Sequence, residues 1–128
     1  MSGLINLPGS KSFLIGSRKK ITMSGSYTSY AGQPLYSTRI CNVVYLHGCI
    51  VLSNGDTSVG DNMATLGVGH RPPDTIFLGI VGNGDDLFFI NINTSGVIQV
   101  SDVEELGRGE GDDMIPLDGL SFLTTKTP

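Results

Sequence analysis

The sequence predicts an all-β protein, a small antiparallel β-sandwich or β-barrel. The 18 glycines and 6 prolines are spread along the 128 residues, so few windows of helical length escape a helix breaker. Between them lie short runs rich in Ile, Val and Phe, which suit the pleated, half-buried surface of a strand. One of these runs is apolar on both faces, which favours a symmetric oligomer in which copies of the chain cover each other.

The length and composition indicate one folded unit. A chain of 128 residues that is 39% hydrophobic has the length of one domain and is too apolar to be disordered. We expect residues 1–34 to form an N-terminal arm or edge strand followed by a loop. Residues 35–128 are expected to form the head domain.

The N-terminal part contains one strand signal before its loop. Ile21 and Met23 alternate with polar residues, as in a half-buried strand. Residues 24–34 are small and polar, which predicts a loop that carries Tyr27 and Tyr30.

Residues 35–53 are predicted to form one long central strand. From Val43 onward both faces are apolar, so one face meets the core and the other needs a second sheet or a neighbouring subunit. On such a strand Cys41 and Cys49 would lie about 26 Å apart, far beyond the reach of a disulfide. We therefore expect two free thiols. Asn54-Gly55, which follows, is a strong hairpin signal.

Residues 64–100 carry the clearest strand pattern. Two runs, residues 75–81 and 87–93, are rich in Ile, Val and Phe, and turn residues close each of them. The turn Asn93-Thr94-Ser95-Gly96 leads into a third run, because a left-handed backbone costs little at Gly96. The pattern predicts three consecutive antiparallel strands.

The C-terminal part is expected to be a loop and one closing strand. Residues 101–113 are acidic and rich in glycine, which is typical of an exposed loop. Apolar positions within residues 115–123 then predict a last strand that closes the sheet, followed by a polar tail.

The charge pattern excludes several classes of partner. The net charge is −4, with 8 basic and 12 acidic residues, and no basic stripe is available to neutralise phosphates, so we expect no nucleic-acid partner.

The N-terminus lacks the cationic start and apolar run of a secretory signal. No apolar run approaches the roughly 18–20 residues of a membrane span, so we expect no membrane insertion and a soluble protein made in the cytoplasm.

The sequence contains no pattern typical of an enzyme. His47 and His70 are the two histidines, and no G-x-S-x-G motif supplies a nucleophile beside a base. Asp85-Asp86 and Glu110-Asp112-Asp113 match no EF-hand spacing and are expected to be solvated. We therefore predict no catalytic residues, no metal ion and no cofactor.

Three segments occur in a characteristic succession. They are Arg39-Ile40-Cys41-Asn42-Val43-Val44-Tyr45-Leu46-His47-Gly48, then Leu66-Gly67-Val68-Gly69-His70-Arg71-Pro72-Pro73, then residues 88–98. The succession resembles the head domains of bacteriophage receptor-binding proteins, which sit at the tips of tail fibres and baseplates. Those heads typically show an R-x-G-N-x-V strand, an L-P-x-G-Y-R-P corner and an I-x-x-x-G-x-I hairpin. The resemblance covers about residues 35–123; Cys41 replaces the usual Gly and His70 the usual aromatic residue.

The resemblance implies a knob-like homotrimer of the virion that contacts other virion proteins and binds a host cell-surface polysaccharide during adsorption. Sugar sites combine stacking rings with fixed hydrogen-bonding groups. The chain has no Trp, so the candidate saccharide-binding residues are Tyr27, Tyr30, Tyr36, His70, Asn83 and Asp85.

Two other functions stay open. The first is a capsid-decorating or baseplate structural trimer without receptor binding. It is favoured because fibre heads usually follow a shaft, whereas about 34 residues precede the head-like region here. The second is a glycan-cleaving enzyme, which would need two carboxylates roughly 5–10 Å apart at a cleft. The acids of this chain cluster in glycine-rich loops instead, so binding without cleavage is preferred.

Overall fold

The structure, a computed structural model, describes residues 16–52, 57–82, 87–104 and 113–128. Over these residues the prediction of an all-β, antiparallel fold is confirmed. No helix within them is long and apolar enough to cross a membrane. The strands are β1 (Ser17–Lys20), β2 (Thr22–Met23), β3 (Tyr27–Ser29), β4 (Tyr36–Ile40), β5 (Val43–His47), β6 (Cys49–Leu52), β7 (Asn62–Thr65), β8 (Ile76–Val81), β9 (Leu87–Ile92), β10 (Val97–Glu104), β11 (Asp113–Pro116) and β12 (Ser121–Leu123), with one 3-10 turn, η1 (Tyr30–Gly32).

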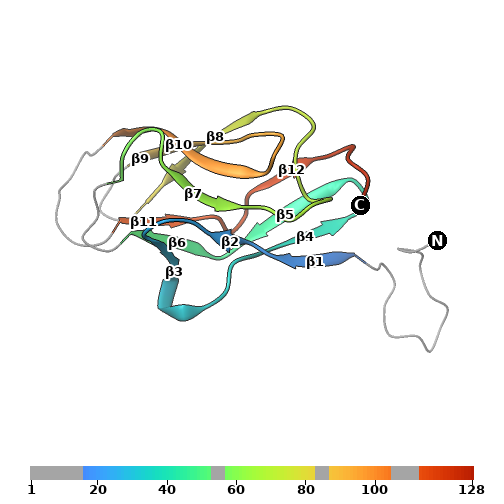
Figure 1. The fold of residues 1–128 in the computed structure, drawn as a ribbon, viewed down its shortest axis with the longest axis horizontal. Helices are drawn as coiled ribbons and strands as arrows, with labels where there is room; N and C mark the ends of the chain where they lie inside the picture. Colours follow the sequence, from blue (N-terminus) through green and yellow to red (C-terminus); the bar gives the residue numbers. More distant parts are fainter. Residues whose placement is uncertain (1–15, 53–56, 83–86, 105–112) are drawn as a thin grey trace.

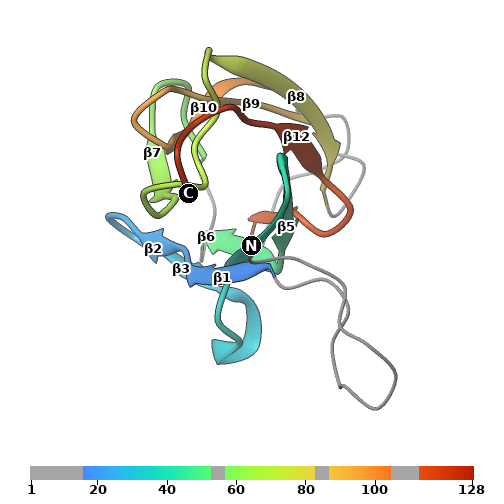
Figure 2. The ribbon, with the colours of Figure 1, turned by 90° about the vertical axis from the view of Figure 1, so that its right-hand side faces the viewer.

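The strands form three antiparallel sheets. The first sheet has the order β1-β4-β5-β12, the second β2-β7-β10-β9-β8 and the third β11-β6-β3. In Figure 1 the strands β8, β9 and β10 of the second sheet lie in the upper part of the view, with the third sheet below them on the left and the first sheet on the right. In Figure 2 the strands surround a common interior, as in a small β-barrel.

The interior is filled by apolar side chains from all three sheets. Leu46 comes from the first sheet, Phe88 and Ile90 from the second, and Ile50 and Ile115 from the third, and each is fully buried. In a strand alternate residues point to the same face, so each strand supplies every second side chain to this core. Burial of each such side chain contributes about 1.5–3 kcal/mol.

The prediction of one continuous strand over residues 35–53 is wrong. The segment forms β4, β5 and β6, with β4 and β5 paired as an antiparallel hairpin and β6 in another sheet. The first break falls at Cys41, whose backbone is left-handed (φ 55°), and the second at Gly48 (φ 112°). Cys41 and Cys49 are free thiols, as predicted, although the extended strand that led to this prediction does not exist.

The predicted loop over residues 24–34 also contains regular structure. It includes β3 and η1, and Tyr27 at the start of β3 is buried in the core. Ile21, between β1 and β2, is fully buried as well. The strands β1, β2 and β3 each form one edge of a different sheet, so this part of the N-terminal segment packs within the same fold as the rest.

The three consecutive strands predicted around Gly96 are present as β8, β9 and β10. Gly96 has a left-handed backbone (φ 84°), and the Asn93 side chain accepts hydrogen bonds from the backbone N–H groups of Ser95 and Val97. The single closing strand predicted for residues 115–123 is wrong. It divides into β11 of the third sheet and β12 of the first sheet.

Candidate functional site

The outer face of the first sheet holds a hollow lined by aromatic side chains. Because strand residues alternate between faces, β4 and β5 each send every second side chain outward. Residues of the two strands lie opposite each other, with Tyr36 facing His47 and Thr38 facing Tyr45. The hollow has a volume of about 360 Å³. We call it the aromatic hollow, and its lining residues are Arg18, Tyr36, Thr38, Ile40, Tyr45 and His47.

Three flat groups are stacked inside this hollow. The Arg18 Cζ atom lies 3.9 Å from the centroid of the Tyr36 ring, within the range of a cation–π interaction. The Tyr36 and His47 rings are stacked with centroids 4.7 Å apart and an interplanar angle of 27°. Since β1 and β5 flank β4 on opposite sides, Arg18 and His47 approach Tyr36 from opposite sides. The stack therefore holds the Tyr36 ring in place.

The polar groups of the aromatic hollow are available to a ligand. Among the described residues, none accepts or donates a hydrogen bond to the Arg18 guanidinium, the His47 imidazole or the hydroxyl groups of Tyr36 and Tyr45. Tyr45 is 42% exposed, so its ring is open to solvent. A hollow with exposed aromatic surface and unused donors can bind a molecule that has both an apolar face and hydroxyl groups.

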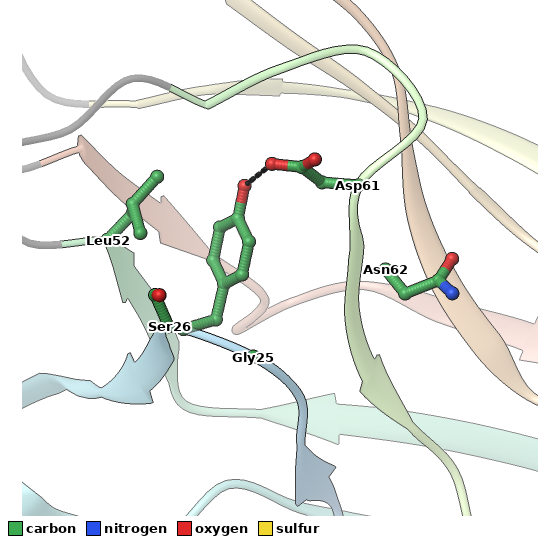
Figure 3. Close-up of a pocket in the computed structure, with 6 residues that line it drawn as sticks. Gly25, Ser26, Leu52, Asp61 and Asn62 are labelled. Atoms are coloured by element: carbon green, nitrogen blue, oxygen red, sulfur yellow. Dashed lines mark hydrogen bonds between the residues drawn. The ribbon is translucent and has the colours of Figure 1, made fainter.

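A second hollow of about 340 Å³ lies between β3, β6 and the start of β7 (Figure 3). We call it the polar hollow; it is lined by Gly25, Ser26, Tyr27, Leu52, Asp61 and Asn62. The Tyr27 hydroxyl donates a 2.7 Å hydrogen bond to Asp61, and Asn62 accepts one of 2.7 Å from Gln99. Burial, and then the bond to Asp61, raise the pKa of Tyr27. The main polar groups here are thus already paired within the fold.

The structure separates the residues predicted to form one saccharide site. Tyr36 lies in the aromatic hollow and Tyr27 in the polar hollow. Tyr30 is exposed on η1 and lines neither of them. Asn83 and Asp85 lie outside the described residues.

His70, the sixth predicted residue, is fully buried. Its Nε2 and Nδ1 atoms each form a 2.7 Å hydrogen bond, to the hydroxyl groups of Ser17 and Ser37 respectively. Burial, followed by the nearby charges of Lys19 and Arg39, lowers the pKa of His70 to about 4. A neutral, enclosed imidazole joins β1 and β4 to the corner after β7, and it is not exposed to a ligand at the surface.

Of the six residues that line the aromatic hollow, only Tyr36 was predicted from the sequence; the missed residues include Arg18, Tyr45 and His47, which carry the other charged and aromatic groups. Tyr45 and His47 are two residues apart and so share a face of β5, a signal that was visible in the sequence. Their proximity to Tyr36 was not visible, because the hairpin turn between β4 and β5 had not been predicted.

The described residues offer little for a metal ion. No group of three or more His, Cys, Asp or Glu side chains lies close enough together among them to hold one. Cys41 is exposed and Cys49 half-buried, and burial raises the pKa of the Cys49 thiol. The predicted lack of a cofactor stays a prediction.

The fold and the hollow define a small antiparallel β-barrel with an open aromatic surface on one sheet. No protein-family model matches the chain, and a search of curated proteins found no match. Among solved structures, the chain is similar to the receptor-binding protein gp15 of Listeria phage PSA. The TM-score is 0.64 at 19% identity, and the match covers 88% of this chain and 67% of that chain. The predicted resemblance to phage receptor-binding proteins is thereby confirmed at the level of the fold.

Proposed function

We propose that this chain is the head of a bacteriophage receptor-binding protein, and that the aromatic hollow binds a saccharide of the host surface. The observation that carries the proposal is the Arg18–Tyr36–His47 stack beside the exposed ring of Tyr45. A sugar ring has an apolar face that stacks on an aromatic ring and hydroxyl groups that need partners. Tyr45 offers the ring, and the neighbouring unpaired groups offer the hydrogen bonds.

The fold shared with gp15 of Listeria phage PSA supports the receptor-binding part of the proposal, because that protein is a receptor-binding protein. It also supports a location in the virion with other virion proteins as partners. The aromatic hollow supports the proposed saccharide ligand, and the fold supports the proposed role in the virion.

We also propose that the chain is a homotrimer, as phage heads of this type are expected to be. The outer face of the second sheet exposes three large apolar side chains on two neighbouring strands, Phe77 (71%), Val81 (64%) and Phe89, and an exposed apolar patch often marks a protein–protein interface. The strand β8, which carries Phe77 and Val81, is also an edge strand of its sheet, as far as the described residues pair. A stable monomer at micromolar concentration in sedimentation velocity would contradict this part.

Binding without cleavage is the proposed mode of action. Hydrolysis of a glycosidic bond requires two carboxylates that flank the bond. No acidic side chain lines the aromatic hollow among the described residues. We therefore expect no release of reducing sugar from host polysaccharide.

Tyr45 and Tyr30 provide a matched test of the proposal. Both are partly exposed, at 42% and 48%, but Tyr45 lines the aromatic hollow and Tyr30 lies elsewhere. We expect Tyr45→Ala to weaken binding to intact host cells at least tenfold, and Tyr30→Ala to leave binding unchanged. Equal binding by both variants would place the site elsewhere. A wild-type trimer that binds no cells would instead favour the capsid-decorating or baseplate role.

A further inference from the structure

The strands of the first sheet present cations and no acidic side chain on its outer face, among the described residues. Its outward side chains are Arg18, Lys20, Tyr36, Thr38, Ile40, Val43, Tyr45, His47, Ser121 and Leu123. The whole chain has 12 acidic and 8 basic residues, so a face with cations and no acid departs from its average charge.

The outward cations differ from the inward ones in how the fold uses them. Lys19 donates to the carbonyl oxygen of Val68, and the guanidinium groups of Arg39 and Arg71 donate to backbone carbonyl groups. In contrast, neither Arg18 nor Lys20 forms a hydrogen bond or ion pair with any described residue. The fold therefore leaves the charges of Arg18 and Lys20 uncompensated at the rim of the aromatic hollow.

The two free cations lie next to the stacked rings. In the pairing of β1 with β4, Arg18 is opposite Thr38 and Lys20 is opposite Tyr36. The Arg18 guanidinium lies over the Tyr36 ring, with Cζ 3.9 Å from the ring centroid, and its N–H groups have no hydrogen-bond partner among the described residues. This planar fork matches the two oxygens of a carboxylate or the oxygens of a phosphate, and it is preoriented by the ring beneath it.

We infer that the saccharide bound in the aromatic hollow is an acidic one, with a carboxylate or phosphate group held by Arg18 and Lys20. The inference rests on the proposed function, because it assigns a charge to the ligand of the same site. Rings and cations side by side favour an acidic sugar over a neutral sugar, which would leave both charges without a partner. They also favour it over a lipid surface, which would not need the stacked rings.

The test uses an array of acidic bacterial polysaccharides, each printed beside a copy whose acid groups have been chemically removed. The wild-type chain is expected to bind the acidic polysaccharides, and to bind their neutral copies at least tenfold more weakly. Arg18→Gln and Lys20→Gln are each expected to weaken binding about tenfold, and binding by the wild type is expected to fall as salt is raised from 0.05 to 0.5 M. Lys126→Gln is the control, because Lys126 does not line the aromatic hollow and its backbone carbonyl group contacts the inward-facing Arg39, so the substitution should leave binding unchanged.

Four outcomes separate the two proposals. Equal binding to acidic polysaccharides and to their neutral copies would overturn the inference that the ligand is acidic, but it would support the proposal that the ligand is a saccharide. Unchanged binding by the Arg18→Gln, Lys20→Gln double variant would also overturn it. No binding to any member would overturn the proposed function itself, and with it this inference. Binding to anionic phosphatidylglycerol vesicles but to no polysaccharide would replace the sugar by a lipid surface.

Discussion

Arg39 on β4 donates a 2.7 Å hydrogen bond from Nη1 to the carbonyl oxygen of Gly69, at the corner after β7. The same Nη1 atom donates to the carbonyl oxygen of Lys126 near the C-terminus, and Nε donates to that of Cys41. The guanidinium is almost fully buried and no acidic partner is found for it among the described residues. The Arg39 side chain thus connects the end of β4 to the corner after β7 and to the C-terminal segment, and all three acceptors are neutral carbonyl groups.

This arrangement predicts that Arg39→Lys destabilises the protein. Lysine has one terminal amine in place of the planar fork and cannot reach all of these carbonyl oxygens at once, which leaves buried acceptors unpaired. We expect a loss of about 2–4 kcal/mol in the free energy of unfolding, measured by urea denaturation. Arg18→Lys is the matched control, since Arg18 is exposed, forms no hydrogen bond with a described residue and leaves a cation beside Tyr36 when it is replaced by lysine, so it should change stability by less than about 0.5 kcal/mol. Similar losses in both variants would contradict the role of Arg39.

The buried His70 predicts a loss of stability in mild acid. Its pKa is lowered from 6.5 to about 4 in the folded state, so the unfolded chain takes up the proton first as the pH falls. Stability should therefore decrease from about pH 6.5 downward and level off below about pH 4, by roughly 3 kcal/mol in total. Both ring nitrogens bond to hydroxyl groups, which can donate or accept, so burial and the charges of Lys19 and Arg39 set the effect.

A His70→Gln variant serves as the control for this pH dependence. It should be less stable than the wild type at pH 7, because one of the two serine contacts is lost. Between pH 6.5 and pH 4 its stability curve should be flatter than that of the wild type, since the titrating group is gone. A wild-type curve with the same slope as that of His70→Gln would show that other groups cause the acid sensitivity.

The backbone conformation at Cys41 predicts that replacing this residue by glycine stabilises the protein. The left-handed backbone at this position (φ 55°) strains any residue with a Cβ atom. We expect Cys41→Gly to raise the free energy of unfolding by about 1 kcal/mol. Cys41→Ala removes the thiol but keeps the Cβ atom, so it should leave stability nearly unchanged. If Ala stabilised as much as Gly, the gain would come from removal of the thiol.

Tyr27 distinguishes the two hollows. Tyr27→Phe removes the hydroxyl that donates to Asp61, which leaves a half-buried carboxylate with one partner fewer. We expect a loss of about 1–2 kcal/mol in stability and no change in binding to host cells. Reduced cell binding at unchanged stability would instead identify the polar hollow as the ligand site.

Much of the strand content could be predicted from local patterns. The strands β8, β9 and β10 followed from alternating apolar residues and from the turn that ends at Gly96, because these signals depend on neighbouring residues alone. These features rest on the short-range preferences of the backbone and of β-branched and aromatic side chains.

The break at Cys41 could not be predicted in the same way. A cysteine in a left-handed turn carries no local signal, because any non-glycine residue disfavours that conformation. The turn is maintained by tertiary contacts, including the pairing of β4 with β5 and the hydrogen bond from the backbone N–H of Thr124 to the carbonyl oxygen of Asn42. The free energy of these tertiary contacts outweighs the preference of a non-glycine residue against the left-handed backbone at Cys41.

The aromatic hollow exists because of that turn. On one continuous strand Tyr36 and His47, which are separated by an odd number of positions, would point to opposite faces. The hairpin reverses the chain and places the two rings on one face, 4.7 Å apart. Local sequence determines which segments are extended and which residues alternate along them. The pairing between segments, a property of the whole fold, determines which side chains share a surface and can bind a ligand together.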